Sequence, residues 1–115
     1  TMEESLEKAL EFSNYSVTLN NQKRILTEKY EENLCVYYLG GKFTASKELI
    51  NFCHTILSKT TQTVIVDDHN TPIEIKELAD FTDILLEKYT EATNQYNEEY
   101  KLLSTKRSVE GLVDV

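Results

Sequence analysis

The sequence predicts a helix-dominated α+β fold, in which two long helices flank two β-hairpins and one short helix. Only three glycines and one proline occur among the 115 residues, so the chain has few natural stopping points for helices. Charged residues make up 28% of the chain and apolar residues 40%, a balance typical of long, solvent-exposed helices. Two internal segments also share one order of strand, turn, strand and helix. A chain of this length fits one domain, expected over residues 1–108.

The first long helix is predicted over residues 3–33. Its apolar positions repeat every seven residues, which is the spacing of a helix seam. These positions are Phe12, Leu19 and Leu26, with Tyr15, Gln22 and Tyr30 roughly interleaved. The alternation of Tyr15, Val17 and Leu19 would also suit a strand, but the Glu- and Lys-rich turns on either side favour a helix.

A β-hairpin is predicted over residues 35–45 and a short helix over residues 47–58. The residues at 35–38 favour a strand, and the two glycines that follow allow the positive φ angles of a tight turn. Phe43 and Thr44 return as the partner strand, and Thr44 or Ser46 can cap the short helix. The apolar face of that helix consists of Leu49, Ile50, Phe52, Cys53, Ile56 and Leu57.

The second hairpin is predicted over residues 64–75 and the second long helix over residues 76–105. The strands of this hairpin are two short apolar runs, on either side of a turn rich in Asp, Asn and Pro. The helix carries two rows of residues seven positions apart, over roughly four heptads. These rows are Leu78, Leu85 and Ala92, and Tyr89, Tyr96 and Leu103. Residues 109–115 are expected to form a C-terminal tail after the helix.

Residues 35–59 and 64–88 align without a gap at an offset of 29 positions. Six of the 25 aligned pairs are identical, and one of them joins Phe52 to Phe81. Two unrelated amphipathic segments built from the same few residue types could produce a similar count. The shared order of elements favours a duplicated hairpin–helix unit. Its four strands could form one antiparallel sheet, because an isolated hairpin is marginal in water.

The two long helices are expected to pack as an antiparallel pair. Their seams hold many tyrosines and few leucines, and this makes a weak two-helix core unless each buried hydroxyl finds a partner. A second chain would cover such seams, so a homo-oligomer, most simply a dimer, is expected. The candidate interaction seam consists of Phe12, Leu19, Leu26, Leu78, Leu85, Tyr89, Ala92, Tyr96 and Leu103.

The formal net charge of −8 argues against nucleic-acid binding, because neutralising phosphates requires a surplus of Lys and Arg on one face. No apolar run reaches the length of about 18 residues that a membrane-spanning helix needs. The start of the chain is acidic, unlike the basic region of a signal peptide. Cys35 and Cys53 lie within apolar patterns and are expected to be reduced packing residues. These features predict a cytoplasmic location.

The turn between the strands of the second hairpin is the most polar cluster of the chain. Asp67, Asp68 and Asn70 offer oxygen ligands, but they lack the spacing of an EF-hand loop and are usual residues of a hairpin turn. Cys53 and His54 are adjacent and point about 100° apart on a helix, so they cannot share a metal ion. No metal, cofactor or catalytic residue is therefore expected, and the chain is predicted not to be an enzyme.

The segments ALEFSNYSVTLNNQKRIL, GGKFTASKELINF and DDHNTPIEI resemble small uncharacterised proteins of T4-like bacteriophages, particularly those of marine cyanobacteria. The resemblance continues through KRSVEGLV and covers nearly the whole chain. A residue usage rich in Asn, Lys, Tyr, Ile and Thr agrees with such a source. The resemblance brings no assigned function and no functional residue.

These observations favour a non-catalytic protein–protein interaction or assembly module that is phage-encoded, with a host or virion protein as a further partner. Such a module would reside in the host-cell cytoplasm or in the virion. The alternative is an acidic regulator that binds a basic host protein or mimics the charge of a nucleic acid. A strong salt dependence of partner binding would favour this alternative.

Overall fold

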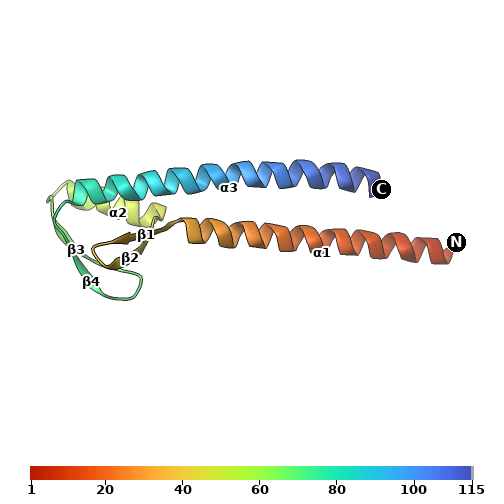
Figure 1. The fold of residues 1–115 in the computed structure, drawn as a ribbon, viewed down its shortest axis with the longest axis horizontal. Coiled ribbons are helices and arrows are strands. Elements are labelled where there is room, and N and C mark those ends of the chain that lie inside the picture. Colours follow the sequence, from red (N-terminus) through yellow and green to blue (C-terminus); the bar gives the residue numbers. More distant parts are fainter. Residues whose placement is uncertain (115) are drawn as a thin grey trace. The chain divides into compact units, whose positions relative to one another are not determined.

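The computed structural model describes the backbone of residues 1–114 and the side chains of residues 1–105. The elements are α1 (Met2–Asn33), β1 (Cys35–Tyr38), β2 (Gly41–Thr44), α2 (Lys47–Leu57), β3 (Thr63–Val66), β4 (Pro72–Ile75) and α3 (Leu78–Asp114). The predicted helix-dominated α+β class is confirmed, with two long helices that flank two hairpins and one short helix in the sequence (Figure 1).

The described chain divides into two compact units, and both long helices contribute to each. Unit 1 consists of residues 1–29 and the residues from 95 onward, and its described elements are parts of α1 and α3. Unit 2 consists of Tyr30–Asn94 and contains both hairpins, α2 and the first half of α3. Among the described side chains, the buried apolar residues all lie in unit 2: Leu34, Val36, Phe43, Ala45, Ile50, Cys53, Ile65, Ile75, Leu78, Phe81, Leu85 and Ala92.

Phe81 lies at the centre of the unit 2 core. Its ring centroid is 4.9 Å from that of Tyr38 on β1 and 4.9 Å from that of Phe43 on β2. Tilted and edge-on pairs of this kind stabilise a core beyond the area that they bury. The side chain of Phe81 is fully buried. The first hairpin therefore packs against the first turns of α3 through aromatic rings.

The two hairpins form two separate antiparallel sheets rather than one four-stranded sheet. In the first, Cys35 pairs with Thr44 and Tyr38 with Gly41. The turn between them consists of Leu39 and Gly40, with φ angles of 49° and 82°. Two central residues with positive φ make a type I′ turn, which matches the right-handed twist of the strands. A leucine in this conformation is unusual, because its Cβ crowds the backbone.

The second hairpin has a longer loop than the first. Five residues separate β3 from β4, whereas two separate β1 from β2. As a result β1 begins 28 positions before β3, but β2 begins 31 positions before β4 and α2 31 positions before α3. The predicted order of elements therefore occurs twice, but the gapless register of the sequence repeat does not carry over to the structure.

The short helix α2 begins after a side-chain cap. Ser46 has an extended backbone (φ −91°, ψ 159°), and its hydroxyl oxygen accepts a hydrogen bond from the Leu49 amide at 3.1 Å. This bond satisfies one of the amides that a helix start leaves without a partner. Ile50 and Cys53 point into the core from this helix. Of the two predicted capping residues, Ser46 is the one that caps.

The long helix α3 differs from the prediction at both ends. It begins at Leu78 rather than residue 76, where the Leu78 amide donates to the Thr61 carbonyl at 3.1 Å. It continues to Asp114, beyond the expected end at residue 105, because the chain there contains no proline and a single glycine costs a helix only about 1 kcal/mol. The predicted tail over residues 109–115 is therefore helical as far as Asp114, and Val115 lies outside the described residues.

Candidate interaction surface

In unit 1, α1 and α3 run antiparallel and touch through polar side chains. Lys29 donates to Glu99 at 2.7 Å, and the hydroxyls of Thr27 and Tyr96 lie 3.4 Å apart. The hydrogen bond from Lys29, together with one from the side-chain amide of Gln95, holds the pKa of Glu99 below its usual range. These contacts orient the two helices, but exposed charge pairs and hydroxyl pairs add little stability.

Aromatic rings of α3 extend this polar seam. The rings of Tyr96 and Tyr100 stack with centroids 5.9 Å apart, and the Lys23 ammonium lies 5.8 Å from the Tyr100 centroid. An ammonium at that distance from a ring face is attracted by about 0.5–1 kcal/mol at an exposed site. Tyr96, Tyr100 and Leu103 are half-buried, as are Leu19 and Leu26 on α1. Unit 1 therefore has a seam but no fully buried apolar layer among its described side chains.

The predicted interaction seam divides between the two units. In unit 2, Leu78, Leu85 and Ala92 are buried in the core, and Tyr89 packs against that core. Leu78, Leu85 and Ala92 are therefore occupied within the single chain, whereas Tyr89 stays partly exposed. In unit 1 the remaining positions are half-buried, apart from Phe12, whose side chain is 65% exposed. Heptad spacing alone could not separate core positions from contact positions.

A second apolar stripe lies on α1, outside the seam predicted from the sequence. Met2, Leu6, Leu10 and Val17 are all exposed. At about 100° per residue they fall within about 80° of one another, on the side of α1 roughly opposite Leu19 and the other seam residues. This group is called the α1 stripe below. Its spacing of four, four and seven residues is readable in the sequence, but the alternation around Val17 obscures it.

The two hairpins of unit 2 are tied together at Asp67. This side chain is almost completely buried, and its carboxylate accepts from the backbone amides of Lys42 (3.0 Å), His69 (2.9 Å) and Thr71 (2.8 Å). The amide of Lys42, followed by that of Thr71, holds the pKa of Asp67 below its usual range. The first of these amides belongs to β2 and the others to the second loop. Asp67 thus has a structural role.

Neighbouring contacts reinforce this connection. The Asp68 amide donates to the Lys42 carbonyl at 2.8 Å, and the Thr44 hydroxyl donates to the Asp68 carboxylate at 2.7 Å. At Gly41 a Cβ atom would lie 2.8 Å from Cγ1 of Ile73, so only glycine permits this approach of the hairpins. The acidic turn that could have suggested a cation site is therefore committed to hydrogen bonds inside the fold.

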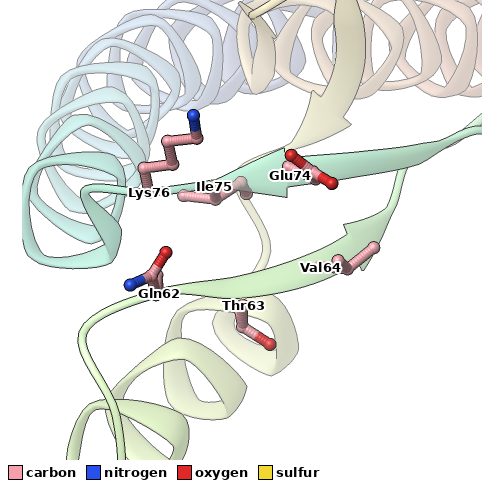
Figure 2. Close-up of a pocket in the computed structure, with 6 residues that line it drawn as sticks. All are labelled: Gln62, Thr63, Val64, Glu74, Ile75 and Lys76. Atoms are coloured by element: carbon pink, nitrogen blue, oxygen red, sulfur yellow. The ribbon is translucent and has the colours of Figure 1, made fainter.

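Two surface hollows occur in unit 2. The first, with a volume of about 250 Å³, is lined by residues of both strands of the second hairpin and of the segments next to them (Figure 2). It is lined by Gln62, Thr63, Val64, Glu74, Ile75 and Lys76. Its lining contains one carboxylate and one ammonium on an open surface, and neither a cysteine nor a histidine.

The second hollow, of about 360 Å³, lies along α3 and is acidic. Its lining consists of Asp83, Leu86, Glu87, Thr90, Glu91 and Asn94. Their spacing of three and four places the three carboxylates on one face of the helix, where like charges repel one another. One turn earlier, the contact with Asp80 raises the pKa of Glu77. This face therefore concentrates negative charge around the exposed side chain of Leu86.

The two cysteines occupy different surroundings. Cys53 is fully buried, and this burial raises the pKa of its thiol, while the nearby Thr82 partly opposes the shift. Cys35 is half-buried on β1, and both thiols are free. Across the described residues, no three His, Cys, Asp or Glu side chains gather in a way that could hold a metal ion. The described helices include none with an apolar stretch long enough to cross a bilayer.

Comparison of this chain with known protein families, with curated proteins and with solved structures yields no match.

Proposed function

We propose that this chain is a non-catalytic interaction or assembly module whose contact surface is the exposed apolar side of α1. The observation that carries the proposal is the contrast within this helix. None of its residues is buried, and yet it holds six exposed large apolar side chains. Four of them, Met2, Leu6, Leu10 and Val17, lie on one side of the helix, whereas Phe12 lies on the seam side and Ile25 lies between the two sides. Apolar surface gathered on one element is a feature of protein–protein contact sites.

The resemblance to T4-like bacteriophage proteins suggests a setting for such a module. We propose that it acts in virion assembly or in binding a host factor, in the host-cell cytoplasm or in the virion. A partner helix that lies along α1 would bury the apolar side chains and supply the packing that a long helix needs, because helices in proteins gain most of their stability from tertiary contacts.

The test is affinity capture from a lysate of the native source with the full-length protein. A matched variant carries Leu6→Glu and Leu10→Glu, two exposed positions where charge does not disturb a core. We expect the immobilised wild-type protein to capture another protein or further copies of this chain. The variant should capture neither. Equal retention by both proteins, or retention by neither together with a monomeric mass for the purified chain, would contradict the proposal.

A second candidate function rests on the acidic face of α3. Asp83, Glu87 and Glu91 surround the exposed side chain of Leu86, an arrangement that suits a basic amphipathic segment of another protein. Binding at this face would weaken steeply between about 50 mM and 500 mM salt, because exposed charges are screened within a Debye length. Glu87→Lys would abolish such binding and leave contacts through α1 intact.

A further inference from the structure

The four residues of the α1 stripe are exposed in the described part of the chain. Leu19 and Leu26 face the seam with α3, whereas Leu6 and Leu10 lie roughly opposite, at about 100° per residue. Within residues 1–29 and 95–105, only one exposed large apolar residue, Leu102, lies on α3. The stripe is therefore the largest group of exposed apolar side chains in the described part of unit 1.

The charges that flank the stripe are distributed unevenly along α1. Glu3, Glu4 and Glu7 lie near its start, and Arg24 lies about 30 Å further along on the side of the stripe, whereas the adjacent Lys23 lies toward the seam with α3. Both basic side chains are at least partly exposed, although Arg24 also pairs with Glu28 at 2.9 Å and Lys23 contacts the Tyr100 ring. Exposed pairs of this kind are weak and can exchange partners.

We infer that the α1 stripe binds the α1 stripe of a second copy of this chain, with the two helices antiparallel. In a parallel pair, Glu3, Glu4 and Glu7 would face the same residues of the partner. An antiparallel pair that crosses between residues 13 and 14 instead brings Glu3 of each helix opposite Arg24 of the other, because opposed residue numbers then sum to 27. The same crossing sets Leu10 of each helix opposite Val17 of the other. This inference rests on the proposed function and names its partner.

The dimer is expected to dissociate on dilution. A stable interface usually buries about 800 Å² on each partner, and four apolar side chains on one helix bury less than this. A weak antiparallel contact also leaves the core of unit 2 unchanged, so variants of the stripe can fold. Ser13 lies on the same side of α1 as the stripe and near the crossing point, at about 100° per residue.

Cysteine cross-linking of the purified full-length protein tests the orientation. In a Cys35→Ser background, with Cys53 buried and unreactive, Ser13→Cys should give a disulfide-linked dimer under mild oxidation. Leu6→Cys should not, because the two copies of residue 6 would lie about 15 Å or more apart along an antiparallel pair. Efficient cross-linking through both positions would indicate a parallel pair, and cross-linking through neither would overturn the inference.

Sedimentation of the same protein tests the surface. We expect a dimer whose population rises with protein concentration. Leu10→Glu should raise the dissociation constant of this dimer at least tenfold. Leu102→Glu, at an exposed position of α3, should leave the dissociation constant unchanged. Circular dichroism confirms that both variants remain helical. A monomer at every concentration would overturn the inference. If the α1 stripe nevertheless retained another protein from the lysate, the proposed function would stand without self-association.

Discussion

Asp67 joins the two hairpins through main-chain amides rather than through apolar contacts. It accepts hydrogen bonds from one amide on β2 and from two in its own loop, and it is almost completely buried. A carboxylate with three amide donors is stabilised in its charged form, which is why its pKa falls. The same side chain therefore sets both the shape of the loop and the spacing of the hairpins.

Asp67→Asn is expected to lower the melting temperature at pH 7, because one of the two acceptor oxygens becomes an amide NH₂ that faces backbone donors. The depressed pKa of Asp67 means that its contribution is present above the usual aspartate pKa of about 3.9 and is lost as the pH falls through the lower folded value. Melting curves from about pH 7 to pH 2 should therefore fall less for the variant. Parallel curves for both proteins would contradict this role.

Leu39→Asn is expected to stabilise the protein by about 1 kcal/mol. Leu39 has a φ of 49° in a type I′ turn, a conformation that costs most residues about 1–2 kcal/mol and that asparagine adopts readily. Urea denaturation measures the gain. The control is Leu39→Ala, which removes the same exposed side chain but lacks the polar group that lets asparagine adopt a positive φ. An equal gain from both variants would show that exposure, rather than the turn, is responsible.

At the scale of elements, the two hairpin–helix segments differ in what they bury. Phe52 on α2 and Phe81 on α3 are identical in the sequence alignment, yet Phe52 is 52% exposed and Phe81 is fully buried. The longer loop of the second hairpin shifts its return strand and helix relative to the first copy. Residues that align between the two segments therefore occupy different environments.

Phe81→Ala should destabilise unit 2 by about 3–5 kcal/mol, because it removes a ring that contacts Tyr38 and Phe43 and leaves a cavity. Phe52→Ala should cost less than about 1 kcal/mol, since half of its ring is already in contact with water. Chemical denaturation of both variants provides the comparison. Similar losses would mean that the copies are equivalent in the folded protein.

At the scale of the whole molecule, the two units are expected to differ in stability. Every buried apolar side chain belongs to unit 2, and no residue of α1 is buried among the described side chains. Local opening is easiest where few apolar contacts form, and a helix without tertiary packing is marginal. The hairpins, α2 and the start of α3 should therefore behave as the stable part of the chain.

Amide hydrogen exchange of the dilute protein should show slow exchange for the core strands and for α3 near Phe81, and fast exchange over the first five turns of α1. Raising the protein concentration should slow exchange in α1 alone, because the second copy protects it. Uniform protection along the chain at low concentration would contradict the difference between the units. A concentration effect within the hairpins instead would place the contact surface elsewhere.

Local signals in the sequence were sufficient to predict the elements. Apolar spacing, the paired glycines of the first turn and the Asp- and Asn-rich second turn predicted all three helices and both hairpins to within a few residues, apart from the end of α3. These signals act between neighbours along the chain, where helix and turn preferences operate. The same reasoning placed the candidate seam on helix faces but could not say what would cover each face.

Tertiary structure decided how those faces are used. It buried Leu78, Leu85 and Ala92 in the chain's own core, separated the hairpins into two sheets, and connected them through Asp67. It also left Leu6 and Leu10 exposed. Burial and long-range hydrogen bonds depend on which distant segments meet, and residue spacing along one element contains no information about that. A periodic stripe shows that a helix needs a neighbour, and the folded chain shows whether it already has one.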